Sequence, residues 1–267
     1  MKYLLKETVD SNIESKQKIL SKSNKKLGKI LNLSFPTIVC KIKSETCMHC
    51  YARKIEDRFN TASKKWIRNL NLYLKDRDKF FKKLKTEIND YAKQNNETVL
   101  RLFASGDFPD IHFAEKIYDL ALEFKNIKIF GYTRMWIIDE YLNKIKDLNK
   151  LDNVTLFCSV DRSLLYNLYK LENSEVRLPT CYVILDKNDN EYSKFDFDLI
   201  FRNYNSRKTV NTYLNGKTKK ILVCPMENGV NVCKDCLNCK FCFKTIKKRG
   251  KRNDDSRKQK AWSDMFS

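Results

Sequence analysis

Cysteine is the residue type in this sequence that is best placed to do chemistry, because eight of the ten cysteines fall in two tight groups. The first group is Cys40, Cys47 and Cys50, and the second runs from Cys224 to Cys242. Thiolates are soft ligands that suit zinc and iron–sulfur clusters. Residues 1–6 are too short and too charged for a secretion signal, so we expect a cytoplasmic protein. In a reducing compartment, clustered cysteines indicate metal or redox chemistry rather than disulfides.

The first group has three cysteines and no fourth one nearby. A structural zinc site needs four ligands, whereas three cysteines can hold a [4Fe-4S] cluster and leave one iron open to a small molecule. His49 lies between Cys47 and Cys50, where strain disfavours it as a fourth zinc ligand. The spacing therefore favours an iron–sulfur cluster, with zinc and no metal as the alternatives.

The second group combines a Cys-Pro pair with a run of closely spaced cysteines. Its members are Cys224, Cys233, Cys236, Cys239 and Cys242. This pattern resembles the ligation of bacterial ferredoxins, and it favours a second iron–sulfur cluster, with zinc as the alternative. Five candidates leave one cysteine spare, which could instead complete the first site. Cys158 and Cys181 stand alone in apolar runs, and we expect them to be buried.

The elements that must position these groups alternate along the chain. Strands are expected at 98–104, 127–133, 154–160, 181–185 and 220–223. Helices are expected over 53–94, with a break at 75–78, and over 111–124, 137–148 and 162–171. Asp110 is expected to cap the helix at 111–124. Apolar strands that alternate with helices predict an α/β fold with a parallel sheet that is buried on both faces.

Changes in composition divide the chain into four parts. Residues 1–30 are polar and are expected to form a loosely held leader before the α/β domain at 31–223. A small cysteine-rich metal module follows at 224–243, and residues 244–267 form a basic tail. The predicted architecture is therefore one sizeable domain that carries a small metal-stapled module.

Several motifs resemble known families. Residues 47–52 are similar to the cluster loop of radical SAM enzymes, although the first gap has six residues where that loop has three. Residues 25–243 resemble the phage gene product 88 family. The matching features are the motifs at 33–36, 50–53 and 105–108, Trp66 with Asn69, and the closing cysteine-rich segment. The radical-SAM-like resemblance implies a partial TIM-barrel-like domain with a [4Fe-4S] cluster. The resemblance to the phage family implies a protein of the phage-infected bacterial cell.

Polar residues end three consecutive predicted strands, where ligands bind in parallel α/β folds, and residues 131–134 end the middle one. Ser105, Gly106 and Asp107 end the first strand, and Ser159 and Asp161 end the third. The resemblance implies that these residues orient S-adenosylmethionine, with Gly106 allowing close backbone approach and Asp107 facing the ammonium group. Ordinary turns and helix starts are the alternative for each. Catalytic residues are not identified by the sequence.

The balance of charge points to polyanionic partners. A net charge of +20 attracts nucleic acid, and a solvated basic surface is the alternative. No apolar run is long enough to span a membrane. We expect a radical-SAM-like enzyme that needs an electron donor and acts on a substrate related to nucleic acid. The alternatives are a non-enzymatic iron–sulfur or zinc protein that binds nucleic acid, and a phage accessory protein that binds a host factor.

Overall fold

The computed structural model describes residues 17–22, 27–172, 174, 176–202, 212–215, 219–224 and 234–245. Its strands form one eight-stranded sheet in the order β1-β2-β3-β4-β5-β6-β8-β7. The strands are β1 (Leu31–Leu33), β2 (Val99–Leu102), β3 (Lys128–Thr133), β4 (Val154–Val160), β5 (Thr180–Ile184), β6 (Leu199–Arg202), β7 (Thr212–Asn215) and β8 (Lys219–Val223). Neighbouring strands pair in parallel, except β7 with β8. The α/β fold with a parallel sheet is therefore confirmed.

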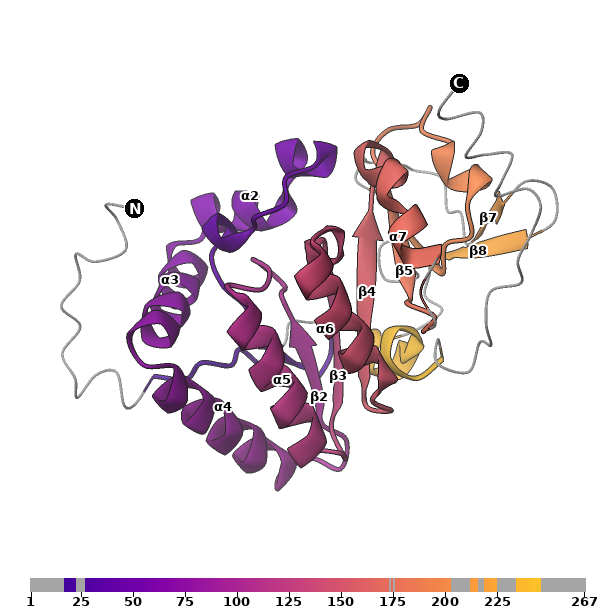
Figure 1. The fold of residues 1–267 in the computed structure, drawn as a ribbon. Coiled ribbons are helices and arrows are strands. Elements are labelled where there is room, and N and C mark those ends of the chain that lie inside the picture. Colours follow the sequence, from indigo (N-terminus) through magenta and orange to yellow (C-terminus); the bar gives the residue numbers. More distant parts are fainter. Residues whose placement is uncertain are drawn as a thin grey trace.

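Helices cover one face of this sheet, as Figure 1 shows for α4, α5 and α6. The helices are α2 (Tyr51–Arg58), α3 (Asn60–Lys75), α4 (Arg77–Ala92), α5 (Ile111–Glu123), α6 (Asp139–Lys150), α7 (Tyr169–Glu172) and α8 (Cys236–Cys239). Shorter turns of 3-10 helix are η1 (Thr37–Val39), η2 (Glu45–His49), η3 (Met135–Ile137), η4 (Arg162–Asn167) and η5 (Glu191–Lys194). From β1 to β6 the strand order follows the chain order, so each connection steps to the next strand in the same direction.

The strands that flank the centre of the sheet are buried on both faces. All seven residues of β4 are buried, and alternate residues point to opposite sides of the sheet. Leu156 and Cys158 face the helices in the main hydrophobic core, together with aromatic side chains such as Phe35 and Phe113. Phe157 faces the other side. Continuous apolar runs are therefore needed in these strands, which is why the sequence located them well.

The helical region after the first cysteines contains two breaks. The predicted break is confirmed at Asp76, whose carboxylate caps α4 by accepting a hydrogen bond from the Lys79 amide (2.9 Å). A second break at Phe59 separates α2 from α3 and was not predicted. Asp110 caps α5 through the Phe113 amide (2.9 Å), as expected. The predicted helix at 162–171 is instead the 3-10 turn η4 followed by the single turn α7.

The described part of the predicted leader is not loosely held. Ile19 and Leu20 are buried, and their backbone amides donate hydrogen bonds to the Glu87 carboxylate (2.7 and 2.9 Å). Ser21 forms a bridge with Asn32 beside β1. The prediction of a loosely held leader was wrong for these residues, because lysines and serines surround the few apolar residues that make the contacts.

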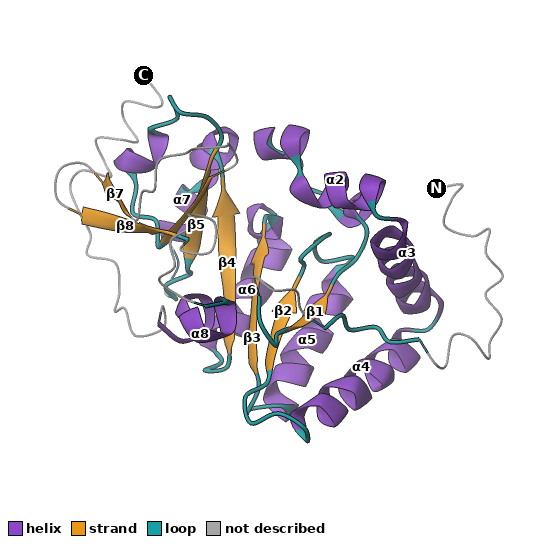
Figure 2. Cartoon of the chain, turned by 180° about the vertical axis from the view of Figure 1, so that it is seen from behind, coloured by secondary structure: helices purple, strands orange, loops and turns teal. Residues whose placement is uncertain are grey.

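The second face of the sheet, which we call the inner face, is covered by the C-terminal cysteine segment. Figure 2 views the molecule from this side, with α8 in front of the strands. The π-helical turn η6 (Phe241–Thr245) follows α8. Phe241 packs with Phe157, and Phe243 packs with Phe130. The segment predicted as a small module therefore packs against the sheet as its second layer.

Some predictions fall outside the described residues. Cys233 is one, and the basic tail lies there from residue 246 onward. None of the helices in the described part of the chain has the length and apolar character that a membrane span requires.

Candidate functional site

The first cysteine group lies between η1 and α2, in the loop at residues 40–50, which we call the cysteine loop. Cys40, Cys47 and Cys50 are free, partly exposed thiols. Burial raises the pKa of the Cys40 thiol to about 12, with further contributions from Asp107, Cys47 and Cys50, while Lys43 opposes the shift. The backbone amide of Cys50 donates a hydrogen bond to the Cys47 carbonyl (3.4 Å), so these two cysteines share one turn of the loop.

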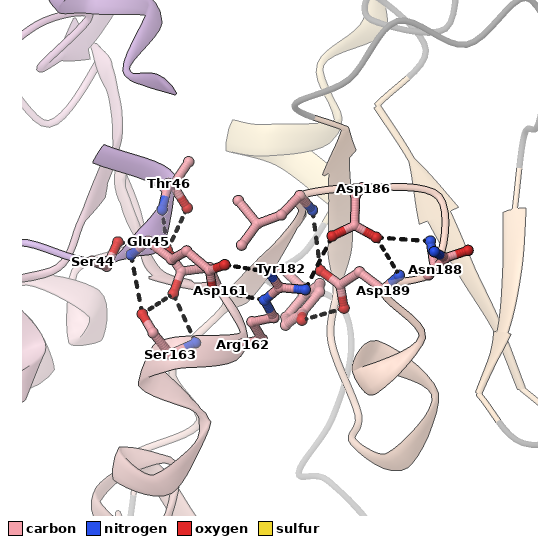
Figure 3. Close-up of polar contacts among 11 residues, drawn as sticks. Ser44, Glu45, Thr46, Asp161, Arg162, Ser163, Tyr182, Asp186, Asn188 and Asp189 are labelled. Carbon is pink, nitrogen blue, oxygen red and sulfur yellow. Dashed lines mark hydrogen bonds and ion pairs between the residues drawn. The ribbon is translucent and has the colours of Figure 1, made fainter. Parts of the chain in front are cut away.

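Asp161, at the carboxyl end of β4, fastens this loop to the sheet, as Figure 3 shows. One carboxylate oxygen accepts hydrogen bonds from the Ser44 hydroxyl (2.5 Å) and from the amide and hydroxyl of Thr46 (3.0 Å to the amide). The other oxygen accepts from the amide and hydroxyl of Ser163 (3.1 and 2.6 Å). Burial opposes ionisation, but these hydrogen bonds outweigh it and the pKa of Asp161 is lowered.

A second set of polar contacts extends this frame to the end of β5 (Figure 3). The Arg162 guanidinium pairs with Glu45 in the cysteine loop and with Asp186 after β5 (3.0 Å). Asp189 accepts hydrogen bonds from the Tyr182 hydroxyl (2.8 Å) and from the Leu185 amide (3.1 Å). The cysteine loop is therefore tied to two neighbouring strand ends that follow it by more than a hundred residues.

Asp107, after β2, joins the same edge of the sheet from the other side. Its buried carboxylate accepts hydrogen bonds from the Thr133 hydroxyl (2.6 Å), the Arg134 amide (3.1 Å) and the Phe108 amide (2.9 Å). Burial raises its pKa, and these hydrogen bonds counteract the increase. The Arg134 guanidinium in turn donates to the Cys47 sulfur (3.6 Å). Asp107 therefore orients the backbone from which Arg134 reaches the first cysteine group.

The remaining residues predicted for S-adenosylmethionine have different surroundings. The Ser105 hydroxyl is buried and has no hydrogen-bond partner among the described residues. Gly106 has a φ of 77°, and a Cβ there would lie 2.8 Å from the Phe35 carbonyl oxygen, so the close approach is to the protein's own backbone. Ser159 is buried, and its carbonyl accepts from the Trp136 indole (3.1 Å). The Ser105 hydroxyl therefore has its hydrogen-bonding capacity left for a ligand.

The second cysteine group gathers on the inner face. Cys224 follows β8, Cys236 and Cys239 lie in α8, and Cys242 lies in η6. Burial raises the pKa of the Cys242 thiol, and so do the other three thiols, while the Tyr132 hydroxyl donates a hydrogen bond to its sulfur (3.0 Å) and lowers it. Cys224, Cys239 and Cys242 pack against the apolar cluster around Phe157, and Cys236 and Cys242 pack against the cluster around Phe130.

Two aromatic side chains and one arginine lie between the two groups. The Tyr51 hydroxyl donates to the Ala104 carbonyl (2.6 Å) and accepts from the Arg101 guanidinium (3.4 Å). That guanidinium also lies over the Tyr132 ring, 5.9 Å from its centre. The sequence analysis missed Arg101, although a single arginine within the apolar run of β2 was a signal that could have found it.

The two isolated cysteines are buried, as expected. Cys158 packs in the core under the helices, and Cys181 packs on the inner face. Within the ranges that the structure describes, no group of three or more His, Cys, Asp or Glu side chains is arranged to hold a single metal ion. A cubane cluster binds each thiolate through a different iron, so its cysteines need not converge on one ion.

The fold and these contacts define a class: an α/β protein whose parallel sheet carries one cysteine group at its strand ends and a second on its inner face. The family model described as Gene product 88 matches residues 4–245. The chain therefore belongs to this family of phage gene products. No curated protein and no solved structure matches the chain significantly.

Proposed function

We propose that this protein is a radical-SAM-like iron–sulfur enzyme whose [4Fe-4S] cluster is held by Cys40, Cys47 and Cys50. The observation that carries the proposal is the position of these free thiols in one loop, which follows β1 and η1 and contacts residues at the carboxyl ends of parallel strands. Ligands of parallel α/β folds bind at this edge. The stepwise strand order and the helices along one face support a partial TIM-barrel-like architecture.

The donor set fits such a cluster. Three soft thiols are offered without a fourth cysteine in the loop, so one iron would remain open to a small molecule. The Arg134 guanidinium and the Lys43 ammonium stabilise negative charge on these sulfurs. The buried Nε of Arg134 has no partner among the described residues. This leaves one donor of that guanidinium for a bound ligand.

Once bound, the cluster supplies the single electron that cleaves the sulfonium of S-adenosylmethionine. The Ser105 hydroxyl is suited to a polar group of the methionine moiety, because it is buried and otherwise unpaired. One oxygen of Asp107 accepts only the Arg134 amide, so it can accept an ammonium group as well. Asp161 holds the cysteine loop through hydrogen bonds, and Ser159 lies two residues before it, near the end of β4. An electron donor is required.

The second group supports a further proposal, a second [4Fe-4S] cluster or, alternatively, a zinc ion. Its described thiols lie among Phe157, Phe241 and Phe243 on the inner face. Such an apolar setting suits a closed site that stabilises the fold or relays electrons. Cys233 is the fifth candidate ligand.

Metal analysis of paired variants tests the first cluster. After anaerobic reconstitution we expect a broad visible absorption band, with iron and sulfide in equal amounts, and about half of both lost in a variant with Cys47→Ser and Cys50→Ser. Cys158→Ser is the matched control, because this cysteine is buried under the helices, away from both groups. Equal iron in the double variant and the parent would refute the assignment.

Cleavage of S-adenosylmethionine tests the enzyme. With dithionite as the electron source, the reconstituted protein should release 5′-deoxyadenosine and methionine. Asp107→Asn should weaken cleavage while leaving the iron content unchanged. A fully loaded protein that releases no 5′-deoxyadenosine would contradict the enzymatic proposal and leave a metal-binding protein.

The charge of the chain favours a substrate related to nucleic acid. The net charge is +20, and Tyr51 and Phe59 are more than half exposed beside Arg53 and Arg58 on α2. Exposed aromatic rings next to basic side chains suit stacking of single-stranded bases. Binding of a single-stranded oligonucleotide should weaken steeply between low and moderate salt, and Phe59→Ala should weaken it further. Binding that does not respond to salt would remove this proposal.

A further inference from the structure

We propose that Arg101 is the partly buried counter-cation of the second cysteine group and links it to the first group through Tyr51 and Tyr132. This inference depends on the proposal that the second group binds its metal through thiolates. It assigns Arg101 the role of a positioning residue, which acts on the metal centre through charge and through its neighbours.

The positive charge of Arg101 is not balanced by a carboxylate of the described residues. No carboxylate in the described part of the chain forms an ion pair with this guanidinium, and its Nε is buried without a partner there. Its interactions are the Tyr51 hydroxyl at 3.4 Å and the Tyr132 ring at 5.9 Å. A buried cation is costly unless a negative charge compensates it. The guanidinium therefore needs a negatively charged partner, and no carboxylate of the described residues provides one.

The cysteines of the second group are the negative groups within its reach. Burial tends to lower the pKa of Arg101, but Tyr51, Tyr132, Cys236 and Cys242 outweigh burial and raise it. Four thiolates around a divalent ion or a cubane leave a net negative charge on the centre, whichever metal is bound. Tyr132 adds the hydrogen bond to the Cys242 sulfur at 3.0 Å. Arg101 and Tyr132 together stabilise an anionic centre.

The same guanidinium extends to the first group. Tyr51 directly follows Cys50, and its hydroxyl is fixed between Arg101 and the Ala104 carbonyl. The contacts run without a gap from Cys50 through Tyr51, Arg101 and Tyr132 to Cys242. Both cysteine groups therefore interact with the Arg101 guanidinium, so a change of charge at one group affects the other through this side chain.

Metal retention tests this role without reference to activity. In a background with Cys47→Ser and Cys50→Ser, the second group holds the remaining metal, and the rate at which a chelator removes it can be followed. We expect Arg101→Gln to raise this rate about tenfold and Tyr132→Phe to raise it less, because a charge is lost in the first case and one hydrogen bond in the second. Arg101→Lys, which keeps the charge, should restore most of the retention.

Arg77→Gln is the matched control. Arg77 also lies over a tyrosine ring, 5.5 Å from the centre of Tyr73, but it pairs with Asp110 on the helical side of the sheet. It should leave the release rate unchanged. Equal rates in the parent and in folded Arg101→Gln would overturn the proposal, and so would equal acceleration by Arg77→Gln. If Arg101→Gln fails to fold, the comparison of Arg101→Lys with Tyr132→Phe decides, because retention in the lysine variant should exceed that in the phenylalanine variant.

The proposed function and this inference can be refuted independently of each other. A variant with Cys236→Ser and Cys239→Ser retains the first group alone, so its iron and sulfide report on that cluster only. No metal in the background lacking Cys47 and Cys50 would refute the role of Arg101 and leave the first cluster standing. If the second centre contains iron, Arg101→Gln should also shift its reduction potential to more negative values, because removal of a positive charge disfavours the reduced form.

Discussion

The two cysteine groups differ in what holds them. The first is in a loop near α2, on the side to which β4 points (Figure 1), and described members of the second lie in α8 and η6 on the inner face of the sheet (Figure 2). The cysteine loop is held by carboxylates, and Met48 within it is 73% exposed. The second group is held by aromatic packing. A polar, open frame suits a group that admits a reactant, whereas an apolar, closed frame suits a group that stabilises the fold.

This difference explains why residue spacing alone gives an incomplete description. Both groups contain a C-x2-C pair, which is enough to propose a metal. The pair does not indicate that Ser44 and Thr46 are fixed by Asp161, more than a hundred residues later. Nor does it indicate that Phe241 and Phe243 insert between α8 and the sheet. The surroundings of the cysteines, rather than their spacing, separate the two proposed roles.

Removal of an aromatic anchor should have the largest effect on the second group. Phe243 is buried against Phe130, so Phe243→Ala should cost about 3 kcal/mol of unfolding free energy and release the metal of the second group. The first group should keep its metal. Phe59→Ala is the control, because that ring is 52% exposed and its loss should change stability by about 0.5 kcal/mol or less. Urea unfolding and metal analysis measure both effects, and simultaneous loss of both groups would show that the two frames are not separate.

Disruption of the polar frame should have the next largest effect, on the first group. In Asp161→Asn, either orientation of the amide turns its NH2 toward a backbone N–H, of Thr46 or of Ser163. We expect a loss of about 2 kcal/mol and weaker metal retention at Cys47 and Cys50. Asp186→Asn is the control at an exposed site, where water replaces the lost contacts. Metal analysis in the background lacking Cys236 and Cys239 measures retention, and unchanged retention would contradict the anchoring role of Asp161.

Acid should weaken the polar frame selectively. The pKa of Asp161 is lowered in the folded protein, so its contribution to stability is complete above the ordinary aspartate value of about 4 and is lost as the pH falls through the lower folded value. The difference in unfolding free energy between the parent and Asp161→Asn should therefore shrink in that acidic range. Urea unfolding as a function of pH gives this difference. A constant difference across the range would mean that the carboxylate charge is not what holds the loop.

Arg134 should have the smallest effect. Its guanidinium donates to the Cys47 sulfur at 3.6 Å, which is a long and weak hydrogen bond. Arg134→Gln should change the unfolding free energy by about 1 kcal/mol or less and speed metal release from the first group a few-fold. Release from the second group should not change. Acceleration at both groups would contradict a local role for this side chain.

The parts of the fold that depend on neighbouring residues could be predicted from the sequence. The strand Val154–Val160 was predicted with its observed bounds, because its continuous burial requires seven apolar or small residues in a row. The cap at Asp110 was also predicted, since a capping carboxylate acts within one helical turn. In contrast, the strand Leu199–Arg202 was missed, because it is short and follows the alternating run of aspartate and phenylalanine at 195–198.

In the site, too, local features could be predicted from the sequence and contacts between distant segments could not. The sequence located the cysteines, and it located Asp107 and Asp161 at strand ends. It could not show that both carboxylates are engaged by protein hydrogen bonds, because their partners come from other loops. Arg101 was missed, and the contact of Tyr132 with Cys242 was not predicted, for a related reason. Each residue is one polar group on an apolar strand, and its relation to the cysteines exists only after the C-terminal segment has packed on the inner face.

Electron paramagnetic resonance of the first group in isolation tests the central proposal most directly. The sample is the variant with Cys236→Ser and Cys239→Ser, reconstituted anaerobically and reduced with dithionite, with and without S-adenosylmethionine. We expect the signal of a reduced [4Fe-4S] cluster that changes when S-adenosylmethionine is added, because the three thiols leave one iron open. A loaded cluster whose signal does not respond, or a variant that binds no iron, would contradict the proposal.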